Sequence, residues 1–237
     1  MSAFQGKTVL VLGGSRSIGA AIVRRFAAEG AKVTFTYAGS RDAALQLAQE
    51  TNSTAVMTDS ADRDAVIARV RDSGPLDILV VNAGIAIFGD ALEVDPDEVD
   101  RLFRINVLAP YHASVEAARQ MPQGGRIIVI GSVNGDRMPL PGMASYALSK
   151  SALQGMARGL ARDFGPRGIT INVVQPGPVD TDANPADGPL KDVMHSFMAI
   201  KRHARTDEIA GLVAWLAGPE AGFVTGSMQT IDGGFGA

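Results

Sequence analysis

The chain has 237 residues, of which 46% are hydrophobic and 20% are charged, and its formal net charge is -3 at pH 7. This length suits one α/β domain with a continuous core, and the nearly balanced charge argues against electrostatic binding of nucleic acid or an anionic membrane. The sequence contains no cysteine, which excludes disulfides, thiolate catalysis and cysteine-based metal sites.

Short apolar segments rich in β-branched residues alternate with segments of helical periodicity. The predicted strands are residues 8–12, 32–36, 55–57, 78–81, 126–130 and 169–174. The predicted helices are residues 18–29, 42–50, 62–72, 97–121 and 145–164, followed by an amphipathic segment at 190–200. This alternation predicts an α/β fold, in which a parallel sheet of about seven strands is covered by helices on both faces.

A glycine-rich turn joins the first strand to the first helix, with the sequence Leu12-Gly13-Gly14-Ser15-Arg16-Ser17-Ile18-Gly19. Glycines allow the backbone to approach a pyrophosphate, and the free N–H groups and dipole of the helix start attract its charge. A tight turn without a ligand would explain the same residues, so the motif needs further support.

The end of the second strand indicates which dinucleotide such a turn would bind. It reads Thr36-Tyr37-Ala38-Gly39-Ser40-Arg41, with no acidic residue before Asp42. An acidic residue here would hold a ribose 2'-hydroxyl and repel a 2'-phosphate, whereas arginine accommodates the phosphate. The sequence therefore favours NADP(H) over NAD(H), although a solvated surface role stays open for Arg16 and, more so, for Arg41.

Tyr146 and Lys150 are four residues apart, so on a helix they share one face. A nearby ammonium favours the phenolate, and we expect it to lower the pKa of Tyr146 enough to make it a proton donor and acceptor. Ser132, fourteen residues earlier, can donate a hydrogen bond to a substrate oxygen. A surface lysine beside a half-buried tyrosine is the alternative interpretation of the pair.

Together these motifs resemble the short-chain dehydrogenase/reductase family over essentially the whole chain. The residues Val224-Thr225-Gly226 and Ile231-Asp232-Gly233-Gly234 resemble its last strand and tail. Leu12 and Ser17 depart from its Thr-Gly-x-x-x-Gly-x-Gly turn, in which they replace the threonine and the middle glycine. The resemblance implies a single Rossmann-type doubly wound domain over residues 1–237 and an NADP(H)-dependent carbonyl reductase or alcohol dehydrogenase. It also implies a catalytic role for four residues, of which the last would hold a water: Ser132, Tyr146, Lys150 and Asn106.

The same resemblance implies where the cofactor is held. Asp59-Ser60 would contact adenine, Asn82-Ala83-Gly84 would line the groove, and Val179 and Thr181 would orient the nicotinamide carboxamide. The full set of expected cofactor-binding residues is Gly13, Ser15, Arg16, Ser17, Ile18, Gly19, Tyr37, Ser40, Arg41, Asp59, Ser60, Asn82, Ala83, Gly84, Tyr146, Lys150, Pro176, Gly177, Val179 and Thr181.

An irregular segment from Pro176 to about Pro189 leads into the amphipathic stretch, and we expect a substrate lid at about residues 182–204. The candidate pocket residues suggest a hydrophobic or aromatic carbonyl substrate. They are residues 85–88, Asn134, Met138, Met143, Met194, Phe197 and Met198. Ordinary core packing is the alternative for each of them.

The expected location and assembly complete this prediction. The chain starts without the basic and apolar segments of a signal peptide, and no apolar run approaches about 20 residues, so we expect a cytoplasmic protein without a membrane segment. His112, His195 and His203 show no ligand spacing, so no metal site is predicted. Family members pair through the helices that correspond to residues 97–121 and 145–164, which implies a homotetramer or a homodimer.

Two alternative functions stay open. The segments at residues 13–16, 133–139 and 164–168 resemble an enterobacterial member of the family that is described as binding cyclic-di-GMP. This resemblance implies a nucleotide-binding regulator built on a reductase scaffold, since a fold does not dictate a function. General similarity also allows a 3-ketoacyl thioester reductase that acts on carrier-bound substrates.

Overall fold

The computed structural model describes residues 3–237 and contains one continuous parallel sheet. Its seven strands lie in the order β3-β2-β1-β4-β5-β6-β7, which confirms the predicted parallel sheet. The strands are β1 (Thr8–Leu12), β2 (Lys32–Tyr37), β3 (Thr54–Met57), β4 (Ile78–Val81), β5 (Arg126–Ile130), β6 (Thr170–Pro176) and β7 (Met228–Ile231).

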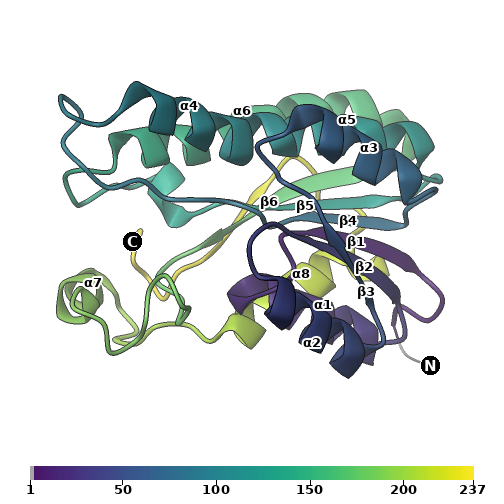
Figure 1. Ribbon diagram of the computed structural model, residues 1–237, viewed down its shortest axis with the longest axis horizontal. Helices are drawn as coiled ribbons and strands as arrows, with labels where there is room; N and C mark the ends of the chain where they lie inside the picture. The colour runs from purple at the N-terminus through teal and green to yellow at the C-terminus, as the bar shows by residue number, and fades with distance from the viewer. Residues whose placement is uncertain (1–2) are drawn as a thin grey trace.

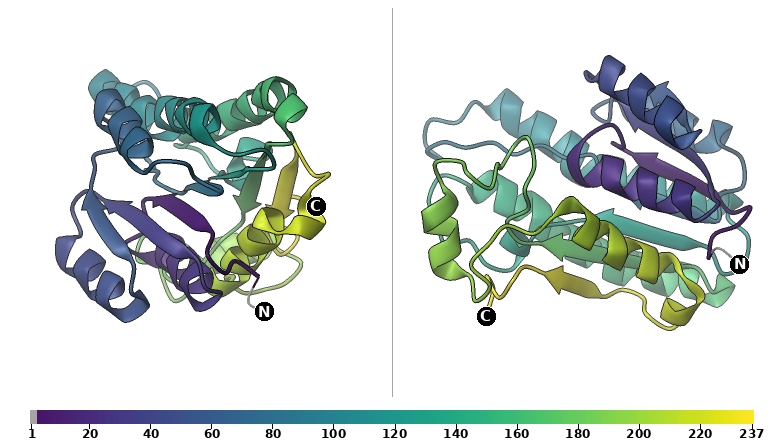
Figure 2. Two further views of the ribbon diagram at one scale, coloured as in Figure 1. Left: turned by 90° about the vertical axis from the view of Figure 1, so that its right-hand side faces the viewer. Right: turned by 90° about the horizontal axis from the view of Figure 1, so that it is seen from below.

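Helices cover both faces of this sheet, as a doubly wound fold requires (Figures 1 and 2). One layer contains α1 (Ser17–Ala28), α2 (Arg41–Thr51) and α8 (Thr206–Ala217). The other layer contains α3 (Arg63–Asp72), α4 (Pro96–Phe103), α5 (Ala109–Gln120) and α6 (Ala144–Phe164). The helix α8 was not predicted, although it packs closely against α1.

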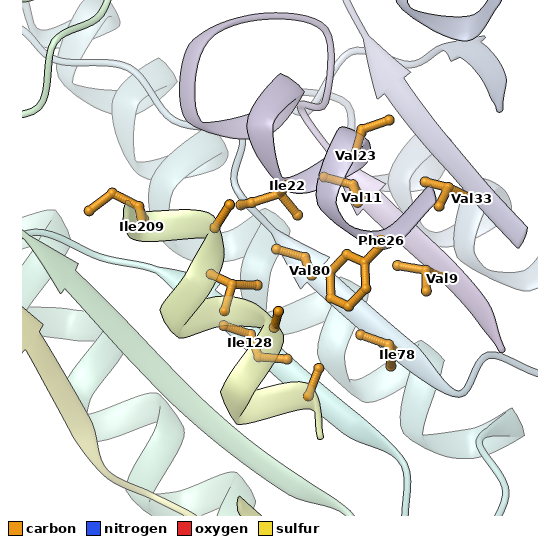
Figure 3. Close-up of a cluster of buried hydrophobic side chains, with 14 of the residues drawn as sticks. Val9, Val11, Ile22, Val23, Phe26, Val33, Ile78, Val80, Ile128 and Ile209 are labelled. Carbon is orange, nitrogen blue, oxygen red and sulfur yellow. The ribbon is translucent and has the colours of Figure 1, made fainter. Parts of the chain in front are cut away.

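Successive residues of the central strands point to opposite faces and fill two separate cores. Val9 and Val11 of β1 belong to the cluster beneath α1 and α8, where Phe26 is fully buried (Figure 3). Leu10 and Leu12 of the same strand belong to the cluster beneath α5 and α6. Because both faces are covered, these strands read as continuous apolar runs rather than as alternating patterns.

The helix predicted at residues 97–121 is interrupted in the structure. A π-helical turn, η1 (Arg104–Leu108), separates α4 from α5 and contains Asn106. Pro110 lies four residues after Asn106, and proline removes the N–H that would bond that carbonyl and crowds it. A wider turn accommodates this clash, and such turns occur often at functional sites.

The amphipathic segment predicted at residues 190–200, within the lid predicted at about 182–204, forms the short helix α7 (Lys191–Phe197). Figure 1 shows α7 at one end of the molecule, outside the two helix layers. His195 Nε2 lies 2.9 Å from Nδ1 of the buried His203 and ties this helix to the following loop. A lid function stays a prediction.

The outer faces of α5 and α6 carry exposed apolar side chains, including Tyr111 and Leu148. These are the helices through which pairing is predicted, and the predicted homo-oligomer stays a prediction. Among residues 3–237, no helix combines the length and the apolar composition needed to cross a membrane.

Candidate active site

The glycine turn packs directly against the end of β4. A Cβ atom added to Gly13 would lie 2.7 Å from Ala83 Cα, and one added to Gly19 would lie 2.1 Å from the Gly13 carbonyl oxygen. Asn82 Nδ2 donates a hydrogen bond of 2.6 Å to that same oxygen. Only hydrogen fits at these two positions, so the glycines allow β1, α1 and β4 to meet at one point.

Ser17 occupies the left-handed region of backbone conformation, with φ of 50°. A side chain in this region costs about 1–2 kcal/mol because its Cβ crowds the following carbonyl. Glycine carries no such penalty, which explains why the family pattern has glycine here. The serine at this position is therefore a source of backbone strain in the turn.

Replacing Ser17 with glycine is expected to stabilise the protein by about 0.5–1 kcal/mol, because the relief of strain exceeds the added backbone entropy of the unfolded chain. Denaturant unfolding would measure the change. Ser17→Ala is the matched control: it removes the hydroxyl but keeps the strain, so it should not stabilise. A Ser17→Gly protein no more stable than Ser17→Ala would contradict the account.

The start of α1 is suited to an anionic group. Within residues 3–237, no side chain caps this helix, and its first turn contains no acidic residue, so its first N–H groups are available to a ligand. Arg16 is exposed beside the turn, and its guanidinium lies 3.8 Å from the carboxylate of Asp182. These features fit a dinucleotide diphosphate next to a 2'-phosphate.

The other expected cofactor residues follow the carboxyl ends of the strands. Parallel register aligns Leu12 of β1 with Val81 of β4, and Ile130 of β5 with Val174 of β6, so the residues after them share one edge of the sheet. Tyr37, Ser40, Arg41, Asp59 and Ser60 lie at the β2 and β3 end of this edge. Their contacts with a cofactor stay predictions.

The four candidate catalytic residues come from three different elements. Ser132 follows β5, Asn106 lies in η1, and Tyr146 and Lys150 lie on the first turns of α6. Lys150 is 6% exposed, its Nζ lies 5.7 Å from the centre of the Tyr146 ring, and it donates a hydrogen bond of 3.1 Å to the Ile130 carbonyl. The structure thus brings the tyrosine and the lysine to the end of β5.

Ser132 is held so that its hydroxyl can donate. Its Oγ accepts a hydrogen bond of 3.1 Å from the backbone N–H of Asn134. Because an N–H already occupies one lone pair of Oγ, the hydroxyl proton is directed elsewhere. This arrangement fits a donor to a substrate oxygen.

Asn106 links the π-helical turn to the rest of the site. Its Oδ1 accepts from the Ile85 N–H at 2.9 Å, and its Nδ2 donates to the Ile85 carbonyl at 2.9 Å and to Ser149 Oγ at 3.1 Å. Ser149 Oγ in turn donates to the Tyr146 carbonyl oxygen at 2.8 Å. Asn106 therefore fixes the loop after β4 against the start of α6.

The protein residues alone do not lower the pKa of Tyr146 as expected. Burial raises the pKa of the Tyr146 hydroxyl, and the hydrogen bond from Ser132 only opposes that effect. Burial also lowers the pKa of Lys150 to about 8. Desolvation disfavours both charged forms, so at neutral pH the tyrosine keeps its proton while most of the lysine keeps its charge.

A cavity of about 570 Å³ opens above Tyr146. Of the predicted pocket residues, Ile85, Ala86, Phe88, Asn134, Met138, Met143 and Met194 line it. Ile87, Phe197 and Met198 do not line it. Phe197 and Met198 pack in a small core cluster with Val133 and Phe235. Eleven further lining residues were not among the predicted pocket, cofactor-binding or catalytic residues: Ile130, Gly131, Val133, Pro139, Leu140, Pro141, Pro178, Ala183, Asn184, Leu190 and Phe235.

The lining of this cavity carries little charge. Tyr146 and Lys150 are its only ionisable side chains among the described residues. Ile18, Asn82, Gly177, Val179 and Thr181 line the same space, so the cavity is continuous with the expected cofactor groove. A dinucleotide in the groove and an apolar molecule in the remaining space would meet at Tyr146.

Comparison with known proteins agrees with this geometry. Residues 13–236 match the family described as Enoyl-(Acyl carrier protein) reductase. A protein of Escherichia coli (strain K12), named cyclic-di-GMP-binding biofilm dispersal mediator protein, is 77% identical over 237 residues, and the match covers 100% of each chain.

Solved structures show the same fold. The crystal structure of BdcA in complex with NADPH has a TM-score of 0.98 at 77% identity, covering 99% of this chain and 96% of that one. A short-chain dehydrogenase/reductase from Serratia marcescens BCRC 10948 has a TM-score of 0.97 at 52% identity, covering 99% of this chain and 100% of that one. With this degree of identity over nearly the whole length, the chain belongs to the short-chain dehydrogenase/reductase family.

Proposed function

We propose that the chain is an NADP(H)-dependent oxidoreductase that reduces the carbonyl group of an uncharged, apolar substrate. The observation that carries this proposal is the grouping of half-buried Tyr146 with buried Ser132 and Lys150 at a cavity that has no other ionisable lining residue among those the structure describes. An anionic substrate would lose its hydration there without gaining a counter-charge other than Lys150.

The glycine turn and its surroundings would hold the cofactor. The free N–H groups of α1 bind the diphosphate, Arg16 and Arg41 hold the 2'-phosphate, and Val179 and Thr181 orient the carboxamide. The NADPH complex of the 77% identical BdcA supports this assignment. NADP(H), when bound, supplies the hydride that adds to the carbonyl carbon.

The residues of this chain supply the proton and stabilise the charge. Tyr146 donates its hydroxyl proton to the substrate oxygen, and the Ser132 hydroxyl donates a hydrogen bond to the same oxygen as it gains negative charge. The Lys150 ammonium stabilises the phenolate that Tyr146 becomes, until a proton from solvent restores it. The raised pKa keeps Tyr146 protonated at neutral pH, as a proton donor requires.

A matched pair of ketones tests the substrate class. We expect NADPH oxidation with 4-methylacetophenone, and at least about tenfold lower kcat/KM with 4-acetylbenzoate, which has a similar shape but carries a charge. Acetoacetyl-coenzyme A tests the carrier-thioester alternative. Exclusive use of the thioester would favour a 3-ketoacyl reductase, and no NADPH oxidation with any carbonyl compound would overturn the proposal.

The kcat for carbonyl reduction should decrease at alkaline pH. We expect kcat to fall as pH rises through about 8, because Lys150 loses its proton there while Tyr146, with its raised pKa, stays protonated. Initial rates with saturating NADPH would measure this, with circular dichroism as the control for an intact fold. A flat profile between about pH 7 and about pH 9 would contradict the role of the Lys150 charge.

Cyclic-di-GMP binding is a second candidate function, favoured by the name of the 77% identical Escherichia coli protein. Its two phosphodiester charges do not suit the cavity above Tyr146, so it would have to use the groove beside Arg16 and compete with NADPH. Calorimetry with cyclic-di-GMP, with and without saturating NADPH, tests this. Binding that NADPH abolishes supports the candidate, and no heat in either titration removes it.

A further inference from the structure

We infer that Gln175 and Asp136 are positioning residues that hold Ser132 in its catalytic orientation. The inference rests on the proposed reductase function and extends it to residues beyond Ser132, Tyr146, Lys150 and Asn106. It is based on a chain of side-chain hydrogen bonds that connects β6 to α6 beneath the serine.

Gln175 lies on β6 and is 1% exposed. Its Nε2 donates to the Ser132 carbonyl oxygen at 3.1 Å and to Asp136 Oδ2 at 2.8 Å. The other oxygen of Asp136 accepts a hydrogen bond of 2.6 Å from Gln154 on α6. The carboxylate therefore joins a strand of the sheet to the helix that carries Tyr146 and Lys150.

The backbone between Ser132 and Asp136 is pinned at both ends by this network. It forms the 3-10 turn η2 (Val133–Gly135), which supplies the Asn134 N–H that bonds Ser132 Oγ. Ser151 Oγ of α6 donates to the Gly135 carbonyl at 2.5 Å, and a Cβ on Gly135 would lie 3.1 Å from the Lys150 carbonyl carbon. The turn thus has little room to move, and the orientation of Ser132 follows from its position.

Stability alone does not explain a glutamine at this position. Its neighbours Val173 and Val174 are fully buried apolar residues, and the Gln175 Oε1 is buried with no hydrogen-bond partner among residues 3–237. A buried polar atom without a partner destabilises the folded state. An apolar residue of similar length would avoid the destabilisation caused by the unpaired Oε1. The hydrogen bonds of Gln175 Nε2 to Ser132 and Asp136 therefore point to a role in the reaction.

A double-mutant cycle tests the inference. Gln175→Met is expected to lower kcat for 4-methylacetophenone by about tenfold while leaving the Kd for NADPH unchanged and the thermal unfolding temperature unchanged or higher. In a Ser132→Ala background the same change should cause no further loss, because the serine it positions is absent. Equal losses in both backgrounds would overturn the inference.

Variants of Asp136 and of a control glutamine extend the double-mutant cycle. Asp136→Ala should lose as much kcat as Gln175→Met, whereas Asp136→Asn, which keeps an acceptor oxygen, should recover most of the rate. Gln123→Met changes an exposed glutamine before β5, at the opposite edge of the sheet, and should leave kcat unchanged. Failure of Asp136→Asn to recover more rate than Asp136→Ala would count against positioning.

A readout that needs no activity separates this inference from the proposed function. We expect hydrogen exchange of the Asn134 amide, measured by NMR, to become about tenfold faster in Gln175→Met because the turn loosens. Wild-type protein inactive on every carbonyl would overturn the reductase proposal, and the exchange measurement would still decide whether Gln175 holds the turn. Unchanged exchange at Asn134 would overturn the inference even in an active enzyme.

Discussion

Replacing Tyr146 with phenylalanine is expected to lower kcat for carbonyl reduction by at least about 10³-fold, because it removes the proton donor beside Ser132 and Lys150. The loss should appear in kcat and kcat/KM alike, since the hydroxyl acts on the developing oxyanion. Initial rates of NADPH oxidation would measure it. Binding of NADPH, followed by fluorescence, should change little, because the phenyl ring remains.

Tyr111→Phe is the matched control for this substitution. Tyr111 lies exposed on α5, away from the cavity, so loss of its hydroxyl should leave kcat unchanged. Tyr146 is half-buried and loses only its hydroxyl group in this substitution, so the free energy of unfolding should change by less than about 1 kcal/mol. A Tyr146→Phe protein that retains more than about a tenth of the wild-type kcat would show that another group donates the proton.

Replacing Gly19 with alanine is expected to abolish NADPH binding and to destabilise the fold by about 2 kcal/mol or more. The added Cβ would lie 2.1 Å from the Gly13 carbonyl and 2.7 Å from Asn82 Nδ2. Both are parts of the turn and of its attachment to β4, so relief of the clash must move the first N–H groups of α1. Calorimetric titration with NADPH and denaturant unfolding would measure the two effects.

Gly165→Ala provides the matched control. Gly165 is exposed after α6, with helical dihedral angles, and an added Cβ would meet no atom within 4 Å among the described residues. Alanine there should leave NADPH affinity unchanged and stability unchanged or slightly improved. NADPH affinity retained within about tenfold in Gly19→Ala would contradict the assignment of this turn to the diphosphate.

Much of the fold could be predicted because buried strands and their turns leave clear signals. The strand predicted at residues 32–36 extends by one residue to Tyr37, and the helix predicted at 145–164 begins one residue earlier, at Ala144. Apolar β-branched runs ended by glycine or proline set these limits. The order of the motifs then placed most of the expected cofactor-binding residues at or after the carboxyl end of a strand.

The helix α8 and the π-helical turn were missed for different reasons. α8 is apolar around much of its surface, with Ile209, Val213 and Leu216 buried, so its periodicity is weak. Glu208 in its first turn and Gly218-Pro219 after its end were available signals. The π-helical turn depends on Pro110 inside a helical pattern, which the prediction of one continuous helix overlooked.

The sequence could predict which of these side chains lie near one another, but not how burial affects their ionisation. The spacing of four residues placed Tyr146 and Lys150 on one face of a helix. It could not reveal that burial raises the pKa of Tyr146 and lowers the pKa of Lys150, which favours the neutral form of both side chains. Contacts between segments that are distant in the sequence could not be predicted either. Phe235 reaches the cavity, and Gln175 reaches Asp136, only because the sheet brings β6, β7 and α6 together.

Transfer of an isotope tests the central claim most directly. Reduction of 4-methylacetophenone with NADPH deuterated at the reactive position of the nicotinamide should give an alcohol with one deuterium on the former carbonyl carbon, detected by mass spectrometry. In deuterated water with unlabelled NADPH, that carbon should carry no deuterium. An alcohol whose carbon is labelled from water, or no alcohol at all, would contradict the account.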